Sequence, residues 1–227
     1  MSLILIRHGQ SVSNQKNLFT GWYDAPLTSL GKEQAIEAGK ILKEHHVHLD
    51  TVHTSLLTRT IQTTYLILET IDKLYLPVHK TWRLNGRHYG ALEGMNKDQA
   101  RKIYGEDQVK QWRRSYRAVP PLADTHSLCQ RYPFLPPEVI PRGESLEQTR
   151  RRMEPYIEEV IQPELLQGRD VLVVAHGNVL RAFTMILENL SEEEVFKVEI
   201  QNAQPIVYDF HSDLSVAKKI IWTRSSY

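Results

Sequence analysis

The chain has 227 residues, with 28 Lys or Arg against 27 Asp or Glu, a balance that excludes a strongly basic surface for nucleic acid or anionic membrane. The length suits one domain with a substantial core. The single cysteine, Cys129, excludes an internal disulfide, and with no recognisable signal peptide or membrane-length apolar run we expect a soluble cytoplasmic protein with a single domain over residues 1–227.

The first predicted element is a strand at residues 3–6. Its four aliphatic residues are too few for a helix and too apolar for a half-exposed strand, so a central strand of a parallel sheet is favoured. Arg7 and His8 follow it at the carboxyl end, the edge of an open α/β sheet where ligands bind. Ser11 and Asn14 add short polar side chains in the same loop. This stretch is a candidate reactive centre.

The next predicted element is a helix from the N-cap Thr28 to about Glu44. His45, His46 and His48 follow it, but no matching set of carboxylates or cysteines is evident nearby in the sequence. We therefore expect an exposed loop and assign no metal.

A short strand at residues 51–53 is predicted to precede a helix over residues 57–71. Arg59 near the start of this helix is unfavourable for the helix dipole, and a bound anion would offset that cost. We expect this helix to carry Ile61, Leu66 and Ile67 near one face, with Tyr65 and Leu68 beside them.

Residues 76–78 are predicted to begin a strand at the edge of the sheet, because Pro77 cannot donate to a central ladder. A loop rich in Arg and aromatic residues follows over residues 82–94. Good helix formers then extend over residues 98–117, with an interruption at Gly105.

Residues 120–141 contain several prolines and show no period, which predicts a long active-site loop or lid at about residues 118–143. Ser145 begins a capping-box pattern for a helix that is predicted to end near Leu166.

A second buried strand is predicted at residues 170–175, and His176 and Gly177 follow it as His8 and Gly9 follow the first. Two such strands of one parallel sheet can place their imidazoles side by side. A helix over residues 178–190 and a strand over 205–210 are expected next, and the tail from about residue 211 is expected to be poorly defined.

Several motifs occur in one order along the chain and together resemble a known family. They are Arg7-His8-Gly9, Phe19-Thr20-Gly21-Trp22, Thr54-Ser55 with Arg59, Trp82-Arg83-Leu84-Asn85, Arg87-His88-Tyr89-Gly90, Trp112-Arg113-Arg114-Ser115-Tyr116 and Ala175-His176-Gly177-Asn178. The set resembles the histidine phosphatase superfamily and, within it, the 2,3-bisphosphoglycerate-dependent phosphoglycerate mutases. The match extends from Leu3 to about Phe210.

The resemblance implies an α/β fold, a three-layer α/β/α sandwich around a mostly parallel sheet. It implies that His8 is the nucleophile, and that Arg7, Arg59 and His176 surround the transferring phosphoryl group. 2,3-Bisphosphoglycerate is the implied priming donor, no metal is needed, and a homodimer is the family expectation. The residues implied to bind substrate are Ser11, Asn14, Thr20, Gly21, Arg87, His88, Tyr89, Lys97, Arg113, Arg114, Gly177 and Asn178.

One position departs from the family. The mutases carry a glutamate that acts as general acid and base where this chain has Gly86. Losing a general acid typically costs about 10²–10⁴ in rate. Glu93 is the nearest carboxylate in sequence and would substitute if a loop made more flexible by Gly86 folded it inward.

Three functions remain open at this point. The first is a phosphoglycerate mutase of glycolysis, impaired or not by Gly86. The second is a phosphatase of the same superfamily that hands the phosphoryl group to water. The third is a catalytically weak phosphoglycerate-binding protein.

Overall fold

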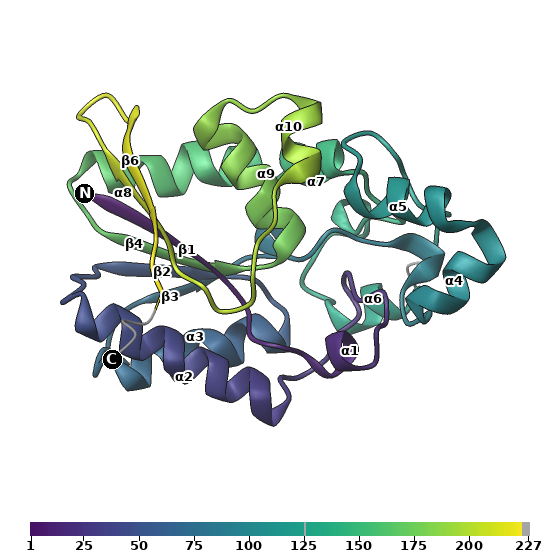
Figure 1. The fold of residues 1–227 in the computed structure, drawn as a ribbon, viewed down its shortest axis with the longest axis horizontal. Coiled ribbons are helices and arrows are strands. Elements are labelled where there is room, and N and C mark those ends of the chain that lie inside the picture. Colours follow the sequence, from purple (N-terminus) through teal and green to yellow (C-terminus); the bar gives the residue numbers. More distant parts are fainter. Residues whose placement is uncertain (125, 224–227) are drawn as a thin grey trace.

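The computed structural model describes residues 1–124 and 126–223 and forms three layers, with one six-stranded sheet between two groups of helices. Figure 1 shows α2 and α3 on one face of the sheet, and α7, α8 and α9 on the other. The helices α1, α4, α5 and α6 gather beyond one end of the sheet. The expected α/β/α sandwich is confirmed.

The sheet has the strand order β3-β2-β4-β1-β5-β6. The first four strands in that order are mutually parallel, while β5 pairs antiparallel with both β1 and β6. The mostly parallel sheet is therefore as expected, with β1 in its interior. The strands are β1 Ser2–Arg7, β2 Thr51–Thr54, β3 Val78–Lys80, β4 Val171–Ala175, β5 Ile206–Phe210 and β6 Val216–Ile221.

Helices connect and cover these strands. The α-helices are α1 Val12–Gln15, α2 Ser29–Glu44, α3 Thr58–Thr70, α4 Lys97–Tyr104, α5 Glu106–Arg114, α6 His126–Arg131, α7 Leu146–Tyr156, α8 Gln162–Leu166, α9 Gly177–Glu188 and α10 Glu192–Lys197. Short 3₁₀ turns occupy Trp82–Leu84, Gly90–Leu92 and Pro137–Val139, and a π-helical segment, Ile157–Ile161, joins α7 to α8. No helix in these described ranges is long and apolar enough to cross a membrane.

The alternation of side chains along β1 builds a core on both faces of the sheet. Leu3 and Leu5 pack with α7 and α9, whereas Ile4 and Ile6 pack with α2 and α3, and all four side chains are fully buried. This explains the uninterrupted aliphatic run: a strand covered on both faces has no polar side.

Most predicted elements are confirmed, and their boundaries follow the expected local chemistry. Thr28 caps α2 by accepting from the Gly31 N–H, and Ser145 forms the predicted capping box with Gln148. Gly105 separates α4 from α5 with φ +87°, a value that favours glycine.

The apolar residues expected near one face of α3 differ in burial. Ile67 and Leu68 are buried, but Ile61 and Leu66 are only half-buried and Tyr65 is exposed. Threonines take their places in the interior: Thr60, Thr63 and Thr64. Each of these hydroxyls donates to a backbone carbonyl three or four residues earlier, so it is buried without an unpaired donor.

Two expectations for irregular segments also need correction. The segment at 118–143 is not a plain loop, because it contains α6 and a 3₁₀ turn; its residue 125 lies outside the described residues. The tail from 211 is not poorly defined, because β6 pairs with β5 along its length. Residues 224–227 of that tail lie outside the described ranges.

Candidate active site

His8 lies one residue beyond the carboxyl end of β1, as predicted. Its backbone N–H donates to the Ala175 carbonyl at 3.0 Å, which continues the β1–β4 pairing past the strand end. Its Nδ1 lies 2.6 Å from the Gly9 carbonyl oxygen. Because a carbonyl oxygen can only accept, Nδ1 carries the ring proton, and the Nε2 lone pair is left for nucleophilic attack.

The His8 ring is also held in its neutral form. Burial, followed by the positive charges of Arg59 and Arg7, places the pKa of His8 well below its ordinary value. Burial is the larger of the two causes. The imidazole is therefore unprotonated at pH 7, as a nucleophile requires.

His176 follows β4, and its ring centroid lies 5.1 Å from that of His8. Its Nε2 lies 2.9 Å from the Ser55 hydroxyl, which in turn lies 2.6 Å from the Thr60 hydroxyl. Thr60 donates to the Leu57 carbonyl, so the Ser55 proton goes to Thr60, and Ser55 accepts from His176. This pattern puts the His176 proton on Nε2 and leaves its Nδ1, which is buried, without a partner among the described residues.

Two buried arginines flank the histidine pair. Arg59 donates to the carbonyls of Gly21 at 2.7 Å and Tyr23 at 3.1 Å, and Arg7 donates to the Ile200 carbonyl at 2.8 Å. These partners are neutral, and burial lowers the pKa of Arg59 to about 10, still charged at pH 7. Asp24 and Glu93 act on Arg59 only from a distance, and among the described residues neither guanidinium bonds to a carboxylate, which favours an anion there.

The histidines and arginines line one cavity of about 220 Å³. Its other conspicuous cation is Arg87, whose side chain is 1% exposed and lies over the Tyr89 ring, 4.7 Å from the centroid. None of its three side-chain nitrogens has a hydrogen-bond partner among the described residues. A buried guanidinium without partners indicates a second place where an anionic group binds.

Tyr89 is polarised by these neighbours. Burial by itself raises the pKa of Tyr89, but the charges of Arg87 and Arg113 and a 2.9 Å hydrogen bond from Asn178 outweigh it and leave the pKa at about 8. Lys97 lies in the same cavity, where burial and Arg113 lower its pKa. This part of the cavity is rich in donors that suit a carboxylate or phosphate.

Most residues implied by the family resemblance come together here. Those lining the cavity are Arg7, His8, Asn14, Thr20, Gly21, Arg59, Gly86, Arg87, Tyr89, Lys97, Arg113, Arg114, His176, Gly177 and Asn178. Ser11, His88 and Glu93 do not line it. Ser11 caps α1 and exchanges hydrogen bonds with Asn14, so it acts on the cavity through that neighbour.

Sequence reasoning missed four residues of the lining: Leu18, Arg181, Glu199 and Ile200. Arg181 was the easiest to find, because it lies one helical turn after Asn178, and its Nη1 donates to the Asn178 side chain at 3.0 Å. Glu199 pairs with Arg114 at the exposed side of the cavity. No sequence signal points to Glu199, since it follows a short helix, α10, that was not predicted.

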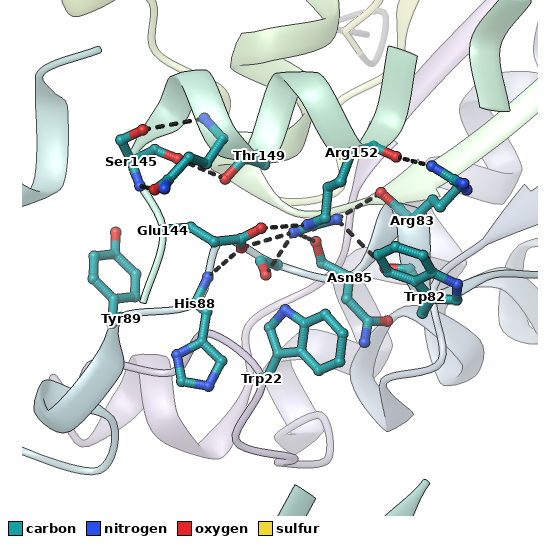
Figure 2. Close-up of polar contacts among 12 residues, drawn as sticks. Trp22, Trp82, Arg83, Asn85, His88, Tyr89, Glu144, Ser145, Thr149 and Arg152 are labelled. Carbon is teal, nitrogen blue, oxygen red and sulfur yellow. Dashed lines mark hydrogen bonds and ion pairs between the residues drawn. The ribbon is translucent and has the colours of Figure 1, made fainter. Parts of the chain in front are cut away.

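Gly86 lies in the cavity wall on a backbone that is firmly held. The Arg152 guanidinium donates to the carbonyls of Arg83 at 2.6 Å and Asn85 at 2.6 Å (Figure 2). It also donates to the Gly86 carbonyl at 3.0 Å. Gly86 is absent from the residues with positive φ, so its φ permits a side chain, but a Cβ there would lie tightly against the Gly21 carbonyl oxygen, at 3.0 Å. The expectation that Gly86 makes this loop flexible is not supported by these contacts.

Arg152 belongs to a buried ion pair behind the cavity wall. Its Nε donates to Glu144 Oε1 at 2.6 Å, and Glu144 Oε2 accepts from the His88 N–H at 2.8 Å. Figure 2 shows Arg152 extending from α7 toward Glu144 and Asn85, with Trp22 below the guanidinium. The two side chains are only 8% and 4% exposed. They hold both sides of the segment that presents residues 86 and 87 to the cavity.

Glu93 is committed elsewhere. Its Oε1 accepts from the N–H groups of Trp22 and Tyr89, and its Oε2 accepts from that of Tyr23. Burial outweighs these bonds and raises the pKa of Glu93 to about 7. A Cβ at Gly21, where φ is +57°, would lie 1.8 Å from Oε1. Glu93 therefore supports the loop at Gly21 from behind and lies outside the cavity.

One group of possible metal ligands exists among the described residues. His48, Asp50 and Asp170 offer ligand atoms within 4.8 Å of one another, so the expectation that no carboxylates accompany the histidine tract is wrong. His48 is mostly exposed, and both carboxylates already accept backbone N–H groups. The group lies away from the cavity lining.

A family model described as the histidine phosphatase superfamily (branch 1) matches residues 3–223. The chain belongs to this superfamily. A solved structure, that of a mycobacterial glucosyl-3-phosphoglycerate phosphatase in complex with VO₃, aligns with a TM-score of 0.76 at 24% identity, covering 99% of each chain. A second, YhfR from Bacillus stearothermophilus, aligns with a TM-score of 0.72 at 21% identity over 92% of this chain and 91% of its own. These likenesses show the fold.

Curated members of the superfamily are more similar in sequence. The 2,3-bisphosphoglycerate-dependent phosphoglycerate mutase 2 of Lactobacillus johnsonii is 49% identical over 220 residues, covering 96% of each chain. The corresponding mutase 1 of Latilactobacillus sakei is 47% identical over 218 residues, covering 96% of this chain and 93% of its own. The phosphoglycerate mutase resemblance is thus confirmed along nearly the whole chain.

Proposed function

We propose that the protein interconverts 3-phosphoglycerate and 2-phosphoglycerate through a phosphohistidine at His8, with 2,3-bisphosphoglycerate as the priming donor. The observation that carries this proposal is one cavity with cations in two places that bond to no carboxylate among the described residues, Arg7 and Arg59 beside the histidines and Arg87 beside Tyr89. A ligand with two anionic groups on a short carbon chain matches both. The names of the relatives favour phosphoglycerates.

The geometry suggests a role for each group. His8 Nε2 attacks phosphorus, while its Nδ1–H stays on the Gly9 carbonyl. Arg7 and Arg59 offset the charge that develops on the phosphoryl oxygens, and His176, whose N–H donates to Ser55, lies beside them. Arg87 holds the second anionic group and so orients the ligand for in-line attack.

We further propose that the enzyme works in the cytoplasm without a metal and forms a homodimer, as the family resemblance implies. The arginines would supply the positive charge that Mg²⁺ supplies in other phosphoryl-transfer enzymes.

The test is an assay of 2-phosphoglycerate formation from 3-phosphoglycerate by the purified protein, with and without 2,3-bisphosphoglycerate. Intact-protein mass spectrometry should show one acid-labile phosphate after exposure to 2,3-bisphosphoglycerate. His8→Ala should abolish both signals, while His211→Ala, at an exposed position, should leave both unchanged. Release of inorganic phosphate without 2-phosphoglycerate would indicate a phosphatase, and no reaction at all would indicate a binding protein.

A further inference from the structure

The cavity is poor in carboxylates near its histidines. Among the described residues that line it, Glu199 is the only one with a carboxyl group. Glu199 is exposed and its carboxylate pairs with Arg114, whereas the charges that act on His8 are those of Arg59 and Arg7. The wall beside the two histidines is instead formed by Gly86: a Cβ built there lies 3.0 Å from the Gly21 carbonyl oxygen and 3.4 Å from both His176 Cγ and Arg59 Nη2.

Neighbouring carboxylates are held away from this wall. Glu93 binds three backbone N–H groups, and Glu144 binds Arg152 and the His88 N–H. The Gly86 carbonyl itself accepts a hydrogen bond from Arg152. To bring either carboxylate to the histidines, several buried charge-assisted hydrogen bonds would have to break.

A phosphoryl transfer needs a proton only when its leaving group is a poor anion. An alkoxide from an alkyl phosphate is strongly basic and must be protonated as it departs. A carboxylate from an acyl phosphate has a conjugate acid with a pKa of about 4, so it departs as a stable anion. A histidine nucleophile surrounded by arginines therefore suffices for the second reaction, whereas the first proceeds slowly without an acid at the leaving oxygen.

Given the phosphohistidine chemistry of the proposed function, on which this inference rests, we propose that His8 is loaded preferentially by acyl phosphates rather than by alkyl phosphates. In this step the bond from phosphorus to His8 Nε2 forms and the bond from phosphorus to the acyl oxygen breaks. The bonding electron pair leaves with the carboxylate. The Nδ1 proton stays on the ring, hydrogen-bonded to the Gly9 carbonyl, so no proton reaches the leaving group.

Tyr89 and Lys97 are the rival proton donors of the cavity. The Tyr89 hydroxyl accepts from Asn178, and Arg87 lies over its ring, which associates it with the second anionic group rather than with the histidines. If either residue protonates the leaving group, the preference for acyl phosphates disappears, and the experiment below shows it.

The experiment compares acetyl phosphate with ethyl phosphate, two donors of nearly equal size that differ in a carbonyl oxygen. The rate of His8 phosphorylation is followed by intact-protein mass spectrometry, with His8→Ala as the background for spontaneous labelling. Three proteins are compared: the natural protein, Gly86→Glu, and Gly86→Gln as a control of the same shape without an acid. Gly86→Glu should raise the rate with ethyl phosphate by about 10²–10⁴ and should not raise the rate with acetyl phosphate. Gly86→Gln should raise neither.

A second measurement needs no variant at residue 86. Across a series of substituted phenyl phosphates, the natural protein should be phosphorylated more slowly as the pKa of the departing phenol rises. Rates that are independent of that pKa, or an equal gain with both donors in Gly86→Glu, would overturn the inference. Failure of every donor to label His8 would instead overturn the proposed function, so the two outcomes are distinguishable.

Discussion

Removing the Arg152 guanidinium tests how the cavity wall is held. In Arg152→Met the carboxylate of Glu144 stays buried without its cation, and the carbonyls of Arg83, Asn85 and Gly86 lose their donor. Breaking a buried ion pair from one side costs about 3–5 kcal/mol. For a domain of this size that free energy lowers the melting temperature by about 6–20 °C.

A matched control lies one residue away on the same helix. Arg151 pairs with Glu147, but its side chain is 74% exposed, so Arg151→Met should cost at most about 1 kcal/mol. Urea denaturation of both variants gives the two free energies of unfolding. The double variant Arg152→Met with Glu144→Gln should lose less free energy of unfolding than the summed losses of Arg152→Met and Glu144→Gln, because it leaves no buried charge unpaired.

The same variants separate stability from positioning. If Arg152 positions residues 86 and 87, then kcat of Arg152→Met measured well below its melting temperature should fall, while that of Arg151→Met should not. An Arg152→Met protein no less stable than Arg151→Met would refute the energetic reasoning. Unchanged kcat in a destabilised Arg152→Met protein would show that the pair is structural only.

Three further predictions follow from the charges in the molecule. Arg87→Met should raise KM for 3-phosphoglycerate by about 10- to 100-fold, the loss expected for hydrogen bonds from a charged group, and an unchanged KM would exclude Arg87 from binding. Incubation with EDTA should leave turnover unchanged; loss restored by Mn²⁺ or Mg²⁺ would contradict this and direct attention to the group at His48. The free energy of unfolding should fall below pH 6.5, because burial lowers the pKa values of folded His8 and His176 well below the ordinary value and, with Arg152, lowers that of His88 to about 4. The unfolded chain therefore takes up these protons first, each at about 1.4 kcal/mol per pH unit. Burial raises the pKa of Glu93 to about 7, so between pH 7 and 4.5 the folded chain takes up the Glu93 proton first, which opposes the fall in stability. Urea denaturation at a series of pH values should therefore show a shallower fall in His88→Asn and a steeper fall in Glu93→Gln.

The histidine pair was predictable because it depends on local patterns. A buried strand followed by His-Gly occurs twice, and parallel neighbours must place equivalent positions side by side. The register of Arg7 opposite Ala175 brings this about. Motif resemblance then identified most of the cavity, since each motif marks a loop that leaves the same edge of the sheet.

The supports behind the cavity were not predictable in the same way. Arg152 and Glu144 look like ordinary surface residues of a helix and its entry, and only the three-dimensional approach of the loop at Gly86 buries them. Glu93 looked available as a proton donor because it lies close in sequence to the predicted cavity loop. Its hydrogen-bond partner Trp22, however, is 71 residues away in the chain. Long-range contacts of polar side chains leave no periodic signal.

The strands illustrate the same limit from the other direction. β6 contains Lys218 and Lys219 at exposed positions of a sheet edge, where charged residues prevent pairing with other chains, so it lacks the apolar alternation that identifies a strand. The threonines of α3 lack an apolar period as well, although they are buried.

The position of β1 has a consequence for the synthesis of the chain. Both of its neighbours, β4 and β5, lie more than 160 residues downstream, so the first strand to leave the ribosome waits for its partners. At ordinary translation rates the delay is on the order of ten seconds or more. During that time the aliphatic run at residues 3–6 has no strand to pair with, and nascent chains that end before residue 171 are therefore expected to aggregate rather than fold.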